Sequence, residues 1–308
     1  MTNAAPIYAK LTIVGAGLIG SSVARAAQHY GAAGHIAIAD ANDAVLEEAK
    51  SLDLGDSYSN SIPAAVAEAD LVIMAVPVGA MASVAAAAAP ALKAGATISD
   101  VGSVKSSVLN SVAPLLPEGV HLIPGHPVAG TEQSGPSAGF ASLFDGRWCI
   151  LTPPEDVDEQ ALQRLSAFWS ELGSTVEKMT ADHHDLVLAI TSHVPHLIAY
   201  NIVGTANDLE AVTRSEVIKY SAGGFRDFTR IAASDPTMWR DVFLNNKEAV
   251  LEMLGRFNED LTALQRAIRW GDGDALFDLF TRTRDIRRRI IDAGQDEDGV
   301  DFGRPHED

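Results

Sequence analysis

The stretch LTIVGAGLIG, Leu11–Gly20, decides the fold at the start of this 308-residue chain. Its apolar run ends in glycines at GxGxxG spacing, and small and apolar residues at helical spacing follow over Leu18–His29. A second apolar run, His35–Ala39, ends in Asp40, twenty residues after the last glycine. This order of strand, glycine turn, helix and a second strand that ends in an acidic residue is typical of a dinucleotide-binding Rossmann unit.

Each glycine of the motif has its own part in this prediction. Gly15 allows the tight turn, Gly17 lets the backbone approach a pyrophosphate, and Gly20 lets helix and strand pack closely. The helix that begins here offers free N–H groups and a positive dipole end to the phosphates. The other residues expected to bind the cofactor are Leu18, Ile19, Val76 and Ser103.

Asp40 bears on the choice of cofactor. Its carboxylate is expected to accept hydrogen bonds from the adenosine ribose and to repel a 2′-phosphate. The following residues, Ala41, Asn42 and Asp43, supply no cation that would neutralise such a phosphate. The sequence therefore predicts NAD as the cofactor in preference to NADP.

The rest of the chain divides by pattern. In the first part of the chain, short apolar runs alternate with helical patterns, which predicts a mostly parallel sheet covered on both faces by helices. The further runs are Leu71–Val76, Thr97–Val101, Val120–Ile123, Trp148–Leu151 and Thr175–Met179. Only helical patterns follow, over Asp182–Ala206, Asp208–Ala222, Pro236–Ile268 and Asp274–Ala293. We expect an α/β fold, with a Rossmann-type NAD-binding domain at 8–179, an all-helical substrate and dimerisation domain at 180–293, and a disordered acidic tail at 294–308.

Composition narrows the function classes. A formal net charge of −18 repels nucleic acid and anionic membrane surfaces, and it requires a local Arg or Lys cluster for any anionic substrate. Cys149 is the single cysteine, so no intramolecular disulfide forms, as in a cytoplasmic protein. The N-terminus does not resemble a signal peptide, and no apolar run reaches the length of a membrane span.

Three later segments carry polar chemistry: DVGSVKSS at 100–107, PGHPVAGTEQSG at 124–135 and TSHVPH at 191–196. The first follows a predicted strand and the second is a predicted loop, both at the carboxyl ends where ligands of such sheets bind. With GGFRDFTRIAASDPTMWRD at 223–241, they resemble the prephenate/arogenate (cyclohexadienyl) dehydrogenase family of tyrosine biosynthesis. The resemblance extends from Leu11 to about Ile291.

The resemblance implies an oxidoreductase, a homodimer through its helical domain, that oxidatively decarboxylates prephenate or L-arogenate with NAD. The reaction needs a neutral base, which His supplies at neutral pH, and the resemblance gives this role to His126. Ser103 would bond near the substrate hydroxyl and nicotinamide, although it could equally cap a helix starting at Val104. Ser192 and His196, four apart on one helix face, would line the pocket, His196 as a catalytic residue.

The remaining expected site residues concern the substrate's charges. Arg230 would bind the ring carboxylate by resemblance, and Arg226, four residues earlier on one predicted helix, could instead pair with surface acids. Trp239 would lie near the pocket. Glu132 is expected near the substrate side chain with Arg226 as its partner, which predicts use of both prephenate and arogenate.

Other interpretations stay open. His183, His184 and His193 fit structural roles better than metal binding, since no third ligand has a suggestive spacing, and Pro195 should kink its helix. A β-hydroxyacid or imine oxidoreductase with the same two halves would share the glycine motif. A non-catalytic NAD-binding scaffold would bind cofactor without turnover.

Overall fold

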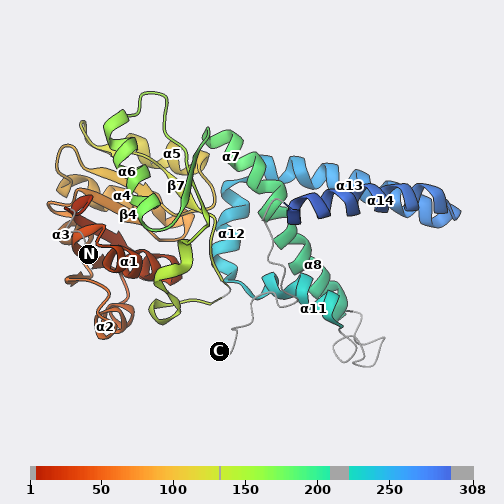
Figure 1. Cartoon of the computed structure of the whole chain (residues 1–308), viewed down its shortest axis with the longest axis horizontal. Helices are drawn as coiled ribbons and strands as arrows, with labels where there is room; N and C mark the ends of the chain where they lie inside the picture. The colour runs from red at the N-terminus through yellow and green to blue at the C-terminus, as the bar shows by residue number, and fades with distance from the viewer. Residues whose placement is uncertain (1–4, 132, 209–221, 293–308) are drawn as a thin grey trace. The chain divides into compact units, whose positions relative to one another are not determined.

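The computed structural model describes residues 5–131, 133–208 and 222–292. The described chain forms two compact units (Figure 1). The first comprises the chain up to Leu197 together with Ile231–Val250, and the second comprises Ile198–Arg230 and the chain from Leu251 onward. The first unit thus includes helical segments that follow residue 179 as well as both sheets.

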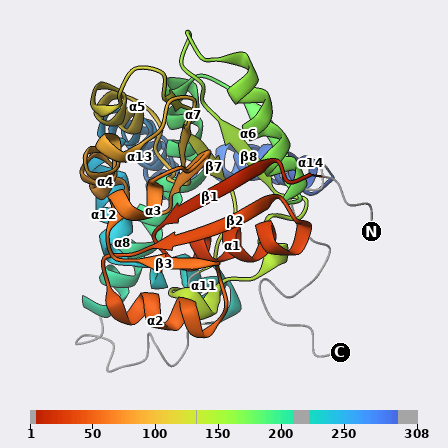
Figure 2. The ribbon, with the colours of Figure 1, turned by 90° about the vertical axis from the view of Figure 1, so that its left-hand side faces the viewer.

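A six-stranded sheet forms the centre of the first unit. Its strands are β1 (Tyr8–Val14), β2 (Ala33–Ala39), β3 (Ser57–Ser59), β4 (Leu71–Met74), β5 (Thr97–Asp100) and β6 (His121–Leu122). All neighbours pair in parallel, in the order β3-β2-β1-β4-β5-β6. Strands β3, β2 and β1 lie side by side in Figure 2. The order reverses between β1 and β4, so the glycine turn after β1 lies at the switch point where such sheets bind ligands.

The connections of this sheet are helical, as the alternating pattern predicts. They are α1 (Leu18–Tyr30), α2 (Asp43–Ser51), α3 (Ile62–Val66), η1 (Val78–Ala80), α4 (Met81–Ala88), η2 (Ala89–Ala91), α5 (Ser106–Val112) and η3 (Ala113–Leu115). The short strand β3 was not expected from the sequence, because its residues, Ser-Tyr-Ser, have no apolar run.

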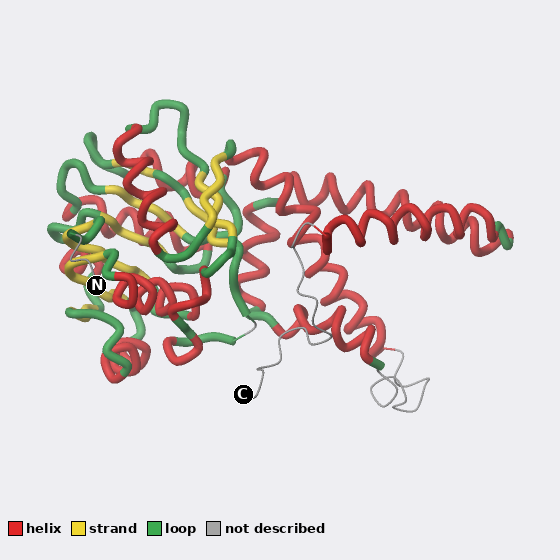
Figure 3. The backbone as a smooth tube through the Cα atoms, in the orientation of Figure 1, coloured by secondary structure: helices red, strands yellow, loops and turns green. Residues whose placement is uncertain are grey.

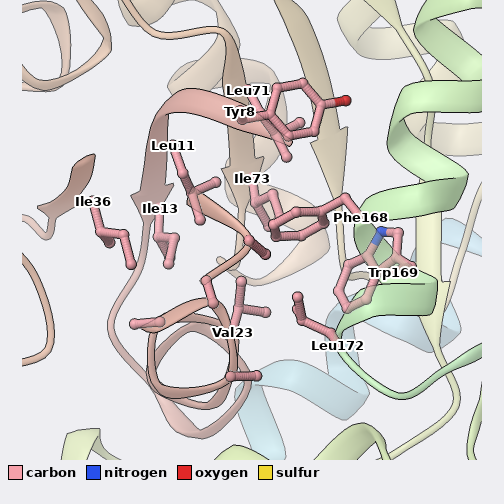
Figure 4. Close-up of a cluster of buried hydrophobic side chains, with 14 of the residues drawn as sticks. Tyr8, Leu11, Ile13, Val23, Ile36, Leu71, Ile73, Phe168, Trp169 and Leu172 are labelled. Carbon is pink, nitrogen blue, oxygen red and sulfur yellow. The ribbon is translucent and has the colours of Figure 1, made fainter. Parts of the chain in front are cut away.

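One face of the sheet carries the main core. Alternate residues of β1, Leu11 and Ile13, lie on this face, where α6 (Glu159–Glu171) contributes Phe168 and Trp169 (Figure 4). All four side chains have no exposed surface. Burial of each such side chain stabilises the fold by about 1.5–3 kcal/mol, so helix α6 contributes much of this stabilisation although it follows the sheet by many residues.

A second, three-stranded sheet contains β7 (Gly125–Pro127), β8 (Trp148–Leu151) and β9 (Thr175–Lys178). Between β7 and β8 lie two short turns, η4 (Pro136–Ala138) and η5 (Ala141–Phe144). Strand β7 pairs antiparallel with β8, so the expectation of a loop over the whole of 124–135 was wrong at its start. Three residues are too few to show an alternating pattern, and Pro127 is tolerated because β7 is an edge strand.

The described chain beyond β9 contains helices and no strand (Figure 3). The helices are α7 (Ala181–Leu188), η6 (Ala189–His193), α8 (Val194–Asp208), α11 (Gly223–Thr229), η7 (Arg230–Ala233), α12 (Pro236–Asn245), α13 (Lys247–Trp270) and α14 (Gly273–Asp292). The expected helix over 208–222 and the expected tail at 294–308 lie almost wholly outside the described residues. The single helix expected over Pro236–Ile268 is two helices, because it breaks at Asn246, whose side chain is buried.

The helix around Pro195 contains a π-helical turn, η6, immediately before the proline. Pro195 has no N–H to donate to the carbonyl of Thr191 and would clash with it in a regular helix. A wider turn accommodates that defect, and π turns of this kind occur frequently at functional sites. The expected irregularity near Pro195 is a π turn over Ala189–His193, which overlaps the start of the TSHVPH segment.

By length and composition alone, the continuous helical stretch Ala181–Asp208 is apolar enough to cross a membrane, contrary to expectation. The core helix of a soluble protein meets the same test. Here His184 and His193 within the stretch are fully buried and make hydrogen bonds inside the first unit. These contacts join the first half of the stretch to the first unit, and 28% of its most apolar window is buried within the chain.

The long helices α13 and α14 of the second unit expose large apolar side chains. The most exposed are Ile268 (67%), Trp270 (74%), Phe277 (70%) and Phe280 (57%). Exposed apolar groups of this size on amphipathic helices indicate a surface that another protein covers.

We expect Gly20→Ala to destabilise the first unit, because a Cβ there would lie 1.9 Å from the carbonyl oxygen of Gly15. Overpacking against rigid backbone should lower the free energy of unfolding by about 1–3 kcal/mol or more, measured by urea denaturation. The control is Gly255→Ala on α13, where a Cβ meets no atom within 4 Å; it should stabilise by roughly 0.5–1 kcal/mol. Equal stability of Gly20→Ala and wild type would contradict this account.

Candidate active site

The glycine turn after β1 has the geometry that a dinucleotide requires. Gly15 adopts φ = +100°, and a Cβ there would lie 2.4 Å from the carbonyl oxygen of Ala75, so only glycine fits. A Cβ on Gly17 would meet nothing within 4 Å, which leaves room for a pyrophosphate. Helix α1 begins after Gly17 without a side-chain cap, so its first N–H groups can bind phosphate oxygens. These residues fit NAD.

Asp40 lies at the carboxyl end of β2 and holds the glycine turn in place. Its Oδ2 accepts a hydrogen bond of 3.0 Å from the backbone N–H of Ala16, and its Oδ1 accepts one of 2.9 Å from Asn42. A carboxylate has further lone pairs, so Asp40 can also accept hydrogen bonds from ribose hydroxyls. Of the other expected cofactor contacts, Leu18 and Ile19 begin α1. Ser103 and Val76 are half-buried and follow β5 and β4, respectively, at the same edge of the sheet.

A buried ion pair lies at the end of β5. Lys105 Nζ donates to Asp100 Oδ2 and, over 2.7 Å, to the carbonyl of Gly125, and neither charged side chain has exposed surface. Asp100 also accepts from the N–H groups of Gly102 and Gly125. Burial raises the pKa of Asp100 and lowers that of Lys105, while each charge stabilises the other. The pair joins the turn after β5 to strand β7.

Asp185 on α7 provides a second anchor for the same turn. Its Oδ1 accepts from the N–H of Lys105 at 2.8 Å and its Oδ2 from the N–H of Ser106 at 2.9 Å. Burial alone would raise the pKa of Asp185, but hydrogen bonds from His184, Lys105 and Ser106 outweigh it and lower that pKa. Asp185 is therefore an anion that caps the start of α5. The cap expected from Ser103 is not observed, since α5 begins at Ser106.

The buried carboxylate of Asp185 also bonds His184, which in turn bonds His126. His184 Nδ1 lies 2.8 Å from Asp185 Oδ1, and His184 Nε2 lies 2.8 Å from His126 Nδ1. His184 is fully buried and His126 is 8% exposed. The three side chains form a continuous chain from α7 to β7.

Burial sets the protonation of this pair at neutral pH. It is the largest cause that lowers the pKa of His126 well below the usual value, and His184, Lys105 and His193 lower it further. Burial likewise lowers the pKa of His184, although Asp185 opposes that shift. His126 is therefore a neutral imidazole at pH 7, the form that accepts a proton.

The π turn and the start of α8 provide the next group. His196 Nδ1 lies 2.8 Å from the carbonyl of Ser192, and the His196 ring stacks on Trp239 with centroids 3.7 Å apart. Trp239 is buried, and its Nε1 has no hydrogen-bond partner among the described residues. Ser192 and His196 thus share a helix face as expected, and Trp239 of α12 fixes the plane of the His196 ring.

His193 is the structural histidine of this region. It is fully buried, its Nδ1 lies 3.1 Å from Asn246 Nδ2, and Asn246 Nδ2 also donates to the carbonyl of Asp185. Burial lowers the pKa of His193 to about 4, so the ring stays neutral. The buried Asn246 at the break between α12 and α13 therefore ties the π turn to α7.

The remaining expected substrate residues include two arginines of the second unit. Arg226 lies on α11 and Arg230 begins η7, so the two are not on one regular helix, and both are exposed within the second unit. Glu132 lies outside the described residues.

Sequence reasoning missed four groups that surround His126: Asp100, Lys105, His184 and Asp185. The signal available for the first two was an acid and a lysine five apart after a strand. The adjacent His184 and Asp185 gave no sign of contact with His126, because 58 residues separate the two histidines.

A Rossmann cradle for a dinucleotide and a buried neutral histidine on the same unit define a two-domain oxidoreductase. Comparison with known families specifies this class further. The nucleotide-binding domain of prephenate dehydrogenase matches residues 23–178 and the dimerization domain of prephenate dehydrogenase matches residues 180–282. The chain belongs to the prephenate dehydrogenase family.

Relatives span nearly the whole chain. A cyclohexadienyl dehydrogenase of Zymomonas mobilis is 45% identical over 281 residues, which cover 91% of this chain and 96% of the relative. A prephenate dehydrogenase of Bacillus subtilis is 32% identical over a match that covers 90% of this chain and 75% of the relative. A crystal structure of prephenate dehydrogenase from Aquifex aeolicus, in complex with hydroxyphenyl propionate and NAD⁺, has a TM-score of 0.86 at 33% identity and covers 92% and 98%. The expected family and fold class are thus confirmed over the other two interpretations.

We predict that His193 makes stability depend on pH. Its folded pKa of about 4 lies below the unfolded value near 6.5, so the unfolded chain binds the proton first. This contribution is complete above pH 6.5 and is lost as pH falls toward 4, by about 2 kcal/mol between pH 7 and 5.

The measurement compares urea unfolding of wild type and His193→Gln at pH 7 and pH 5. The variant should lose less stability over this interval, although His126 and His184 still contribute to its pH dependence. The matched control is His183→Gln, at an exposed position on α7, which should keep the wild-type difference. An undiminished difference in His193→Gln would refute the assignment.

Proposed function

We propose that this protein is a cyclohexadienyl dehydrogenase that oxidatively decarboxylates both prephenate and L-arogenate with NAD, to 4-hydroxyphenylpyruvate and L-tyrosine. The observation that carries the proposal is a buried, neutral His126 on β7, which Lys105 joins to the turn after β5 of the sheet that holds the dinucleotide cradle. The relatives named for prephenate and for cyclohexadienyl substrates support it.

The chemistry divides between cofactor and protein. NAD, when bound, accepts the hydride that leaves C4 of the cyclohexadienol ring. His126 takes the proton of the C4 hydroxyl, which lets the C4–O bond become a carbonyl. The ring carboxylate then departs as CO₂, and its bonding electrons complete the aromatic ring. His126 can return its proton to the phenolate oxygen, so the base ends in its starting form.

Other residues of the first unit are proposed to hold the substrate. Ser103 would donate to the C4 oxygen beside the nicotinamide. Ser192 and His196 would line the pocket, and the stack on Trp239 limits the orientations of the His196 ring. The proposed domains remain 8–179 for NAD binding and 180–293 for substrate and dimerisation.

The experiment for the proposed function is NADH formation with prephenate and with L-arogenate in turn. Turnover of both is expected. His126→Asn should lower kcat by roughly 10²–10⁴-fold for both substrates with little change in NAD affinity, because it removes the general base. His183→Asn, at an exposed position, serves as the control. Absence of turnover with both substrates would overturn the proposal, and turnover of one alone would overturn dual specificity.

Anchoring of the substrate is proposed for Arg230, which would bind the ring carboxylate common to both substrates. Arg230→Ala should therefore raise KM for both substrates, since a charged hydrogen bond contributes about 1.5–3 kcal/mol.

Glu132, with Arg226 as its partner, would face the side chain in which prephenate and arogenate differ. Glu132→Gln should weaken arogenate use more than prephenate use, because only arogenate offers an ammonium. If Glu132→Gln lowers kcat/KM equally for arogenate and prephenate, another residue discriminates between the two substrates.

Assembly follows from the exposed apolar faces of α13 and α14. We propose a cytoplasmic homodimer through these helices, and light scattering should give twice the 32.5 kDa chain mass. Phe277→Asp with Phe280→Asp should shift the mass toward the monomer. Thr283→Asp adds the same kind of charge at an exposed position of α14 and should leave the dimer intact. A monomer mass for wild type at micromolar concentration would exclude this assembly.

A further inference from the structure

We infer that Asp185 and His184 are positioning residues that hold His126 in the tautomer with its proton on Nδ1 and its lone pair on Nε2. This inference rests on the proposed function for its catalytic consequence, since it explains which nitrogen takes the substrate proton. The geometry itself is independent of that function.

The first step concerns His184. A carboxylate only accepts hydrogen bonds, so the 2.8 Å contact between Asp185 Oδ1 and His184 Nδ1 places a proton on Nδ1. A neutral imidazole carries one ring proton, and burial disfavours the charged form of His184. His184 Nε2 is therefore a hydrogen-bond acceptor.

The second step transfers this assignment to His126. The 2.8 Å contact between His184 Nε2 and His126 Nδ1 requires a donor on His126, because His184 Nε2 only accepts. The proton of neutral His126 thus lies on Nδ1, which leaves Nε2 as the acceptor. The two ring planes are inclined at 72°, with their centroids 5.1 Å apart.

Asp185 has little freedom to change this arrangement. Its carboxylate also accepts from the N–H groups of Lys105 and Ser106, and its carbonyl accepts from Asn246. The carboxylate is thus fixed by the backbone of α5, and Asp185 fixes His184. When His126 gains the substrate proton, the buried cation of Lys105 opposes the new charge, while the anion of Asp185, which contacts His184, favours it.

Nitrogen-15 NMR of the wild-type protein tests the tautomer without substrate. The His126 signal, assigned by its loss in His126→Asn, should report a protonated Nδ1 and an unprotonated Nε2 at pH 7. A protonated Nε2 would overturn the inference. This readout holds even if neither prephenate nor arogenate is turned over, so it separates failure of the inference from failure of the proposed function.

Kinetics test the catalytic consequence. His184→Met removes the acceptor, so kcat should fall by roughly 10²-fold, the lower end of what a general base contributes, with KM and NAD affinity nearly unchanged. His184→Gln can accept from His126 with its amide oxygen and donate to Asp185 with its amide nitrogen. His184→Gln should therefore retain most of the wild-type kcat. A merely space-filling role of His184 would instead predict equal kcat for His184→Gln and His184→Met.

The matched control is Asp182→Asn. Asp182 lies on the same helix and bonds the Ser106 hydroxyl at 2.8 Å, without contact to the histidines. Its kcat should equal that of wild type. An unchanged kcat in folded His184→Met, or equal losses in His184→Met and His184→Gln, would overturn the positioning role.

Discussion

The ion pair of Lys105 and Asp100 is the interaction on which the site depends. It lies without exposed surface between the end of β5 and strand β7, and both members also bond backbone groups of Gly125. Removal of one partner of such a buried pair typically costs about 3–5 kcal/mol, because the other charge is left uncompensated. The pair therefore fixes the strand that carries His126 to the turn that carries Ser103, and it does so with no net charge.

From this anchor the two halves of the site meet along one edge of the first unit. The glycine turn follows β1 and the segment Asp100–Ser107 begins at the end of β5. Because these strands are parallel, both segments lie at the carboxyl edge of the six-stranded sheet. Helix α7 then contributes Asp185, which caps α5 and contacts His184 of the histidine pair. The turn after β5 lies at the same edge as the glycine cradle and bonds Gly125 beside His126, so it links the two parts of the site although they are distant in sequence.

Local patterns allowed the Rossmann sheet, the helical second half and the glycine cradle to be predicted from sequence, because each rests on periodicity or on a spacing of a few residues. The surroundings of His126 could not be predicted. Its partner His184 is distant in sequence, and β7 is too short to show alternation. The break at Asn246 was missed for a similar reason, since a buried contact with α7 and His193 accompanies it and helix-breaking residues do not mark it.

A buried base such as His126 has to be neutral before the proton transfer and stabilised as a cation after it. Burial, together with the charge of Lys105, keeps His126 neutral, which the first half of the reaction needs. The same environment would oppose the imidazolium that proton transfer creates. Asp100 neutralises Lys105, and Asp185 stays ionised because hydrogen bonds outweigh its burial. The negative charge closest to the histidine pair is therefore that of Asp185, so the environment can favour the protonated base without making it protonated beforehand.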